Sequence, residues 1–194
     1  MPKDTKHMLQ KAAVRLFAER GYSAVSMREL AEAVGMRQGG IYNHFPSKQA
    51  LLADLMATHM ERLLVTLDDA LDPAGTPRDR LAAFVQNHMA FHLDHPDDVF
   101  LAYMEIRSLE PENRKTIIAL RNTYEHALRE ILSEGVTLGE FDIADVAVHA
   151  RMLLAMMTGA TTWYKDGGRL RRDDVAQCYL QGAMQSVGAR GEQQ

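Results

Sequence analysis

The chain is short of the residues from which covalent cross-links and membrane anchors are built. Its 194 residues include one cysteine, Cys178, which leaves no pair for an internal disulfide. So little cysteine is typical of a reducing compartment, and we expect a cytoplasmic protein. The first residues lack the apolar stretch of a secretory signal, and the longest apolar stretch, 152–160, is far shorter than a bilayer-spanning helix. The composition excludes a disulfide-rich secreted fold and predicts no membrane partner.

Sequence motifs of common enzyme classes are also absent. The chain contains no glycine-rich phosphate loop, no Gly-x-Ser-x-Gly turn and no histidine close in sequence to Cys178. We therefore expect neither an enzyme nor a bound cofactor. One arrangement is similar to a zinc site, because His88 and His92 share a helix face and His95 follows closely. It lacks a His-Glu-x-x-His motif and a neighbouring cysteine. Histidines that line a pocket or the surface are the favoured interpretation, and no metal is predicted.

Positive charge is concentrated at the N-terminus, although the whole chain has a formal net charge of −4. The first 50 residues carry eight lysines and arginines against four acidic residues, a net charge of +4. The remaining residues carry 14 against 22, a net charge of −8. A basic segment on an acidic body suits phosphate binding, since only the docking face must attract the nucleic-acid backbone. The distribution favours a nucleic-acid partner over the alternative of a merely solvated charged face.

Apolar residues recur at helical spacing along the whole chain, and no strand-type alternation persists. In the first helix they are Leu9, Ala12, Ala13, Leu16 and Phe17. Glycines, prolines and capping residues predict helices over 9–20, 26–34, 37–45, 48–71, 77–94, 97–108, 112–134, 142–165 and 173–188. The predicted fold is all-α with about nine helices, divided into a three-helix N-terminal domain over 1–48 and a larger helical domain over 49–194.

A tight corner between two short helices is the sharpest feature of the N-terminal domain. Ser26 and Glu29 have the spacing of a capping box that opens the first of these helices. Ala31 is small enough for two crossing helices to touch, and Gly35 tolerates the positive φ that the turn needs. The core beneath is expected to contain Leu30, Ile41 and Phe45. The pattern predicts a helix-turn-helix whose outer helix enters a major groove. A helical corner without a DNA-binding role is the alternative.

The expected outer helix carries side chains suited to DNA. Arg37 and Gln38 can make paired hydrogen bonds to guanine and adenine. Gly39 and Gly40 are poor helix formers, which makes sense where the backbone must approach DNA closely. The residues expected to hold phosphates are Ser26, Arg28, Tyr42, Asn43, His44 and Lys48.

Three segments, 21–31, 35–36 and 41–52, resemble the N-terminal domain of the TetR family of transcriptional regulators. They lie within about the first quarter of the chain. The resemblance implies an all-helical homodimer, usually a repressor, that binds a palindromic double-stranded operator. It also implies release of the operator when a small molecule binds the C-terminal domain; activation would use the same parts.

Individual positions take roles from the same resemblance. Tyr42, His44 and Lys48 fall on the family's phosphate-contacting positions, and Arg37 and Gln38 fall on its base-reading positions. The sequence departs from the family's pattern at one further position. Gly40 stands where many relatives have a small polar residue, so a side-chain contact expected there is lost.

Dimerisation and effector binding are both expected of the larger domain. We assign dimerisation to helices 142–165 and 173–188, because the first is rich in small residues and the second has an apolar stripe. The stripe consists of Val175, Tyr179, Ala183 and Val187. Adaptable methionines and aromatic residues predict an apolar effector pocket. The residues assigned to it are Phe91, Phe100, Met104, Tyr124, Met152, Met156, Trp163 and Arg169. For both assignments, the alternative is that these faces only complete the monomer core.

A second resemblance concerns segments 135–141 and 163–170. They are similar to the C-terminal part of TetR-family regulators of fatty-acid, sterol or aromatic-acid breakdown that respond to CoA thioesters. Trp163 can stack on an adenine ring, and several basic residues can pair with phosphates. These are Lys165, Arg169, Arg171 and Arg172. The resemblance implies an acyl-CoA effector. The alternatives are a regulator of drug efflux that senses unesterified hydrophobic ligands and, in a different class, a helical protein-binding adaptor.

Overall fold

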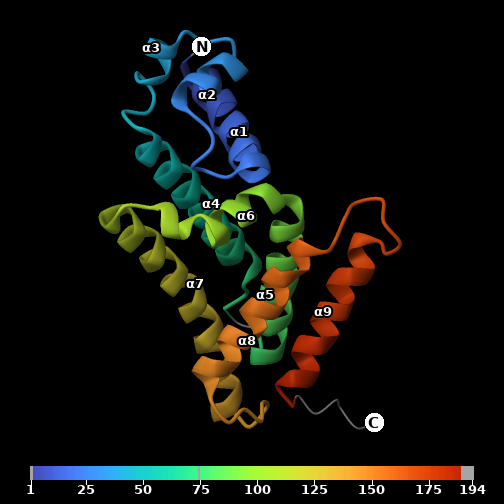
Figure 1. Cartoon of the computed structure of the whole chain (residues 1–194). Coiled ribbons are helices and arrows are strands. Elements are labelled where there is room, and N and C mark those ends of the chain that lie inside the picture. Colours follow the sequence, from blue (N-terminus) through green and yellow to red (C-terminus); the bar gives the residue numbers. More distant parts are fainter. Residues whose placement is uncertain (1, 74, 189–194) are drawn as a thin grey trace. The chain divides into compact units, whose positions relative to one another are not determined.

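The computed structural model describes residues 2–73 and 75–188, which form helices without a strand (Figure 1). The first four helices are α1 (Pro2–Arg20), α2 (Met27–Ala33), α3 (Gln38–Ile41) and α4 (Lys48–Ala70). They are followed by α5 (Pro77–Asp94), α6 (Pro96–Met104), the 3₁₀ turn η1 (Ile106–Ser108) and α7 (Pro111–Thr137). The last elements are α8 (Val146–Gly159), the 3₁₀ turn η2 (Ala160–Thr162) and α9 (Arg172–Ser186). For these residues, the predicted all-α class and the expected nine helices are confirmed.

Side-chain caps fix where several helices begin. Ser26 caps α2 in a complete capping box, as its spacing predicts. Thr76 caps α5 in the same way, and Pro77 occupies the first turn, where its missing N–H costs nothing. Asp145 caps α8 by accepting a hydrogen bond from the N–H of Val148 at 2.9 Å. These caps depend on partners three residues away, so local sequence is enough to place them.

Three helices are clearly shorter than predicted. The helix expected over 97–108 ends at Met104 and is followed by the 3₁₀ turn η1. The helix expected over 37–45 contains only Gln38–Ile41, and residues 42–44 continue as a turn. Two of its four residues are glycines, each less favourable than alanine in a helix by about 1 kcal/mol, so the chain does not extend it. The helix expected over 142–165 begins only after the Asp145 cap and tightens into a 3₁₀ turn after Gly159.

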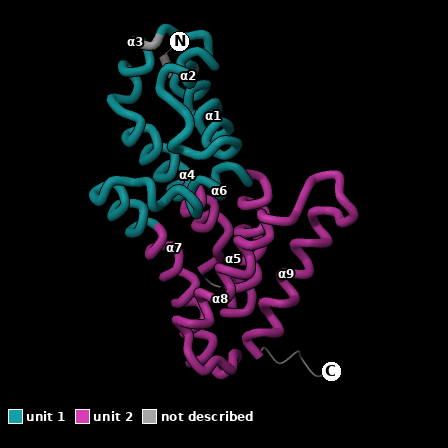
Figure 2. Tube along the Cα trace, in the orientation of Figure 1, with its two compact units in different colours: residues 1–61, 96–120 teal, residues 62–95, 121–194 magenta. Residues whose placement is uncertain are grey.

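The chain divides into two compact units, shown in different colours in Figure 2. Unit 1 comprises residues 1–61 and 96–120, and unit 2 comprises residues 62–95 and 121–194. Unit 1 therefore contains α6 and the first part of α7 in addition to the N-terminal helices. The expected division into domains 1–48 and 49–194 is a division by role and stays a prediction.

Each unit has its own core. In unit 1, α2 and α3 bury Leu30, Ala31 and Ile41, which α6 and α7 join through Leu101 and Ile117. The buried apolar residues of unit 2 include Phe84, Val85, Met89, Leu128, Leu153 and Met157. Two histidines, His88 and His92, are buried in unit 2 as well. Within the described ranges, no helix combines the length and the apolar character needed to cross a membrane.

Candidate nucleic-acid interface and effector residues

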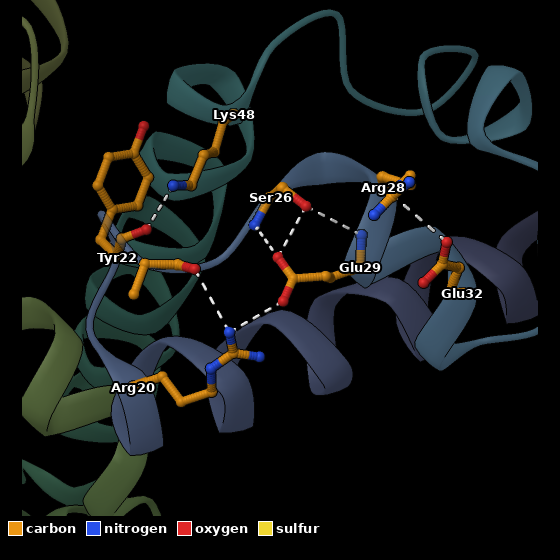
Figure 3. Close-up of polar contacts among 8 residues, drawn as sticks. Arg20, Tyr22, Ser26, Arg28, Glu29, Glu32 and Lys48 are labelled. Carbon is orange, nitrogen blue, oxygen red and sulfur yellow. Dashed lines mark hydrogen bonds and ion pairs between the residues drawn. The ribbon is translucent and has the colours of Figure 1, made fainter.

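The start of α2 is fixed by hydrogen bonds between Ser26 and Glu29 (Figure 3). The Ser26 hydroxyl accepts from the N–H of Glu29 at 3.2 Å and donates to its Oε2 at 2.7 Å, while the N–H of Ser26 donates to the same oxygen at 2.8 Å. Arg20 donates to the other oxygen, Glu29 Oε1, at 2.9 Å and to the carbonyl of Ala24 at 3.4 Å. The pKa of Glu29 is lowered to about 2, mainly by its hydrogen bonds with Ser26 and to a smaller extent by its hydrogen bond with Arg20. The carboxylate is therefore charged at neutral pH and holds the turn before α2 in place.

The turn between α2 and α3 has the predicted helix-turn-helix features. Gly35 has a φ of +70°, and the N–H of Met36 donates to the carbonyl of Ala31 at 2.8 Å. Ala31 and Ile41 are completely buried, and Phe45 is nearly so. The prediction of a small core beneath a tight corner is confirmed. Within residues 37–44, Ile41 belongs to this core, whereas Arg37, Gly39, Tyr42 and Asn43 form an exposed surface.

This surface includes Arg37, one of the two predicted base-reading residues. Arg37 and Gly39 are exposed, and Tyr42 has 46% of its surface accessible. Asn43 is exposed and His44 is half-buried. The side chain of Gln38 lies outside the described part of the structure. The exposed residues Arg37, Gly39, Tyr42 and Asn43 lie close together in the sequence, before and after the buried Ile41, as a surface that reads DNA requires.

Two of the predicted phosphate-binding cations have partners within the protein. Arg28 lies 3.6 Å from Glu32 on α2, and both side chains are largely exposed, so this pair is weak and open to exchange with a phosphate. Lys48 donates to the carbonyl of Tyr22, and its ammonium lies 4.1 Å from the centre of the Tyr22 ring. Burial lowers the pKa of Lys48. To contact a phosphate, Lys48 would have to leave this position, and its predicted role stays a prediction.

The predicted effector residues differ in burial and are divided between the two units. Phe100 and Met104 belong to unit 1, and the other six belong to unit 2. Only Phe91 and Tyr124 are buried; the remaining residues, Phe100, Met104, Met152, Met156, Trp163 and Arg169, are exposed. The sequence patterns identified apolar residues but could not separate exposed ones from buried ones.

A buried polar chain joins three helices of unit 2. Tyr124 on α7 lies with its hydroxyl 3.2 Å from Nδ1 of His88 on α5, and Nε2 of His88 lies 3.3 Å from the hydroxyl of Thr158 on α8. Hydrogen bonds offset the cost of burying these groups. His88, interpreted from the sequence as a histidine that lines a pocket or the surface, is completely buried and is not a surface residue. Thr158 was not singled out, because a single polar residue on an apolar helix leaves no distinctive sequence pattern.

The basic residues that follow Trp163 differ in their partners. Arg171 binds Asp174 through two hydrogen bonds of 3.0 and 2.9 Å, and Arg172 binds Asp94 at 2.5 Å and the carbonyl of Ala90 at 2.8 Å. Lys165 and Arg169 are exposed, and Trp163 donates from Nε1 to the hydroxyl of Tyr179 at 3.3 Å. Lys165 and Arg169 are thus better placed than the two ion-paired arginines to bind an added phosphate.

The apolar stripe predicted on the last helix is mostly buried by the chain itself. Val175, Ala183 and Val187 are nearly or completely inaccessible, because α9 packs along α5 in unit 2. The assignment of these three residues to a dimer interface is therefore wrong. On α8, by contrast, Val148, Met152 and Met156 remain exposed at a spacing of four residues, with 52%, 58% and 38% of their surfaces accessible. They form one apolar row on the helix.

Comparison with known families decides the assignment. A model of the tetR family of bacterial regulatory proteins matches residues 9–55, and a model of the tetracyclin repressor-like C-terminal domain matches residues 74–187. The chain belongs to the TetR family. It is therefore a transcriptional regulator and not an enzyme, and the interpretation as a protein-binding adaptor is not retained.

Individual TetR-family relatives match over most of their lengths. The HTH-type transcriptional repressor KstR2 of Rhodococcus jostii (strain RHA1) is 31% identical over 172 residues, which cover 87% of this chain and 83% of that protein. Among solved structures, the TetR family transcriptional regulator PfmR from Thermus thermophilus is 33% identical with a TM-score of 0.83, covering 96% of this chain and 99% of that one. AibR, solved in complex with isovaleryl coenzyme A and operator DNA, is 27% identical with a TM-score of 0.83, covering 90% and 95%.

In this TetR-family chain, His88, His92 and His95 have partners other than a metal. The rings of His88 and His92 stack with their centroids 3.6 Å apart, and His92 donates from Nδ1 to the carbonyl of His88 at 3.0 Å. Burial is the main cause that lowers the pKa of His92 well below its usual value, so the ring is neutral. His95 donates to the carbonyl of Phe91 and accepts from Arg62, both at 2.8 Å. Among the residues that the structure describes, no group of three or more potential ligands is placed to hold a metal ion.

Proposed function

We propose that this TetR-family regulator is a repressor that binds a palindromic operator as a homodimer and releases it when a hydrophobic effector, a CoA thioester, binds to unit 2. The observation that carries the DNA-binding part is the exposure of Arg37, Gly39, Tyr42 and Asn43 around the buried core of Ala31, Ile41 and Phe45. A rigid core beneath exposed polar side chains is what base reading requires.

The operator can be found without knowing the regulated genes. Duplexes enriched by the purified protein from a random-sequence pool are expected to contain an inverted repeat whose half-sites lie one helical turn, roughly 34–36 Å, apart, since each protomer contributes one reading helix. Their affinity should fall steeply with salt, because each phosphate contact releases counterions. Enrichment of an asymmetric sequence, or of none, would refute the proposed operator.

The exposed row on α8 supports the proposed dimer. Val148, Met152 and Met156 present an apolar surface at the regular spacing that helix pairing uses. Sedimentation of the wild type should give a dimer, and Met152→Glu should give a monomer that binds the operator far more weakly. Ile118→Glu is the matched control, because Ile118 is also exposed but lies outside this row. A dimer that is unaffected by Met152→Glu would place the interface elsewhere.

The CoA part of the proposal is supported by the complex of AibR with isovaleryl coenzyme A and by the exposed side chains of Trp163, Lys165 and Arg169. A thermal melt with pairs of acyl-CoAs and their free acids tests it. A ligand present at a hundred times its Kd adds about 2.7 kcal/mol of stability, a shift of several degrees. Arg169→Ala should reduce the shift, whereas Arg129→Ala, an exposed arginine on α7, should not. A shift with free acids alone would favour unesterified effectors.

A further inference from the structure

Tyr22 is held through nearly all of its polar groups by residues distant in the sequence. Its N–H donates to Oε1 of Glu105 at 2.9 Å, and its carbonyl accepts from Lys48. Its hydroxyl accepts from Nε2 of Gln49 at 3.0 Å. Its ring packs edge-on against Phe17, with centroids 5.3 Å apart. A residue bound by α1, by the start of α4 and by the residue that follows α6 has little freedom to move.

The residues that hold Tyr22 are themselves joined at the corner between α6 and α7, which we define as residues 105–110. The hydroxyl of Ser108 donates to Oε2 of Glu105 at 2.6 Å. Gln49 bridges α4 to this corner, because its Nε2 donates to the carbonyl of Ser108 at 2.7 Å and its Oε1 accepts from the N–H of Glu110 at 3.0 Å. The corner belongs to unit 1, the same compact unit as α2 and α3 (Figure 2).

Tyr22 is joined to the start of α2 by a short connection. Tyr22 opens the short connection that leads to Ser26, the cap of α2, and its carbonyl also accepts from the N–H of Val25 at 3.4 Å. In Figure 3, Lys48 donates a hydrogen bond to the carbonyl of Tyr22 at one end of this connection. At the other end, hydrogen bonds join Arg20, Ser26 and Glu29. A displacement of Tyr22 would therefore be passed to the helix that supports the base-reading surface.

We propose that Glu105 and Gln49 are positioning residues for operator binding: through Tyr22, the corner between α6 and α7 sets the placement of the helix-turn-helix. The inference rests on the proposed DNA-binding function. Neither residue lies on the base-reading stretch 37–44, so their effect on DNA affinity is indirect. Because α7 continues from this corner to Thr137, the corner is also linked covalently to unit 2, where the effector is proposed to bind. Loosening the corner would thus lower the affinity for operator DNA.

The test combines amide exchange at Tyr22 with DNA binding. Glu105→Ala removes the acceptor, whereas Glu105→Gln keeps an oxygen that can accept the Tyr22 N–H without the charge. Gln49→Ala removes the hydrogen bonds that join α4 to the corner and to Tyr22, and it tests the same role if Glu105→Ala does not fold. Glu112→Gln is the matched control, since Glu112 carries the same charge at the start of α7 but pairs with Lys115 in solvent. All variants are measured at a temperature where each is fully folded, so lost stability alone cannot change the affinity.

Glu105→Ala is expected to speed exchange of the Tyr22 amide and to weaken binding to a duplex enriched by the wild type by about tenfold, equivalent to about 1.4 kcal/mol. Glu105→Gln should lose less of the affinity for this duplex, and Glu112→Gln should keep the affinity of the wild type. Unchanged exchange, or wild-type affinity in both Glu105→Ala and Gln49→Ala, would overturn the positioning role alone. A wild-type protein that enriches no duplex would refute the proposed function and this inference with it.

Discussion

Gly135 is the position at which one added methyl group should do the most damage to unit 2. It lies near the end of α7, and the ring of Phe141 covers its Cα. A Cβ at residue 135 would lie 2.0 Å from Cδ2 and 2.4 Å from Cε2 of Phe141. The ring cannot retreat easily, because Phe141 is only 4% exposed and the N–H groups of Glu140 and Phe141 both donate to the carbonyl of Gly135, at 2.9 and 3.1 Å.

The cost of Gly135→Ala follows from these contacts. To restore ordinary contact, the ring must move from 2.0 Å to at least 3.4 Å from the new methyl group. Such overpacking typically costs 1–3 kcal/mol, and for a clash this close we expect a cost of about 3 kcal/mol. Alanine is more favourable than glycine inside a helix by about 1 kcal/mol. We therefore expect Gly135→Ala to lower the free energy of unfolding by about 2 kcal/mol.

Urea unfolding at a fixed protein concentration measures this change, and the concentration is fixed because a dimer is stabilised by its own association. The same substitution is also measured in the Phe141→Ala variant, which by itself lowers the free energy of unfolding by about 3–5 kcal/mol. With the ring removed, the clash disappears and Gly135→Ala should become neutral or stabilising, by up to about 1 kcal/mol. A Gly135→Ala variant as stable as the wild type, or the same loss of stability with and without the Phe141 ring, would refute the predicted clash.

Three further predictions concern charge and pH. Burial beside His88 keeps the pKa of His92 well below 6.5. The contribution of the neutral ring to stability is therefore complete above about pH 6.5 and is lost as the pH falls below that value. His92→Gln should flatten the pH dependence of the urea midpoint. The pKa of about 2 for Glu29 means that its contribution is complete above the usual glutamate value of 4.5 and is lost as the pH falls from there towards 2; Glu29→Gln should remove this loss, as read by circular dichroism in acid. Arg28→Ala should reduce the salt dependence of operator binding by about one phosphate contact, whereas Lys115→Ala should leave it unchanged, as read from affinities at several salt concentrations.

Features of the fold that depend on near neighbours could be predicted from the sequence. The capping box of Ser26 and Glu29 involves residues three apart, and the positive φ of Gly21 and Gly35 follows from turns that glycine favours. The buried side of the helix-turn-helix follows from helical periodicity over about ten residues. In each case, a few adjacent residues contain the whole physical reason.

Contacts between distant segments could not be predicted in this way. Glu105 reaches the N–H of Tyr22 across 83 residues, and no local pattern marks either residue as a partner. The same limit explains the error at α9. Helical spacing identified an apolar stripe but could not tell that α5 of the same chain covers Val175 and Ala183. Knowledge of which helices pack together was the missing information.

DNA reading by the exposed residues of the segment 37–44 is the central property proposed for this regulator. The direct measurement compares the wild type with the double variant Arg37→Ala/Tyr42→Ala, by fluorescence anisotropy on a duplex enriched by the wild type. Both side chains are exposed, so the melting temperature should not change. Affinity should fall roughly tenfold to a hundredfold, since each good base contact contributes about 1–3 kcal/mol. Equal affinity in the two proteins, with both fully folded, would contradict the account.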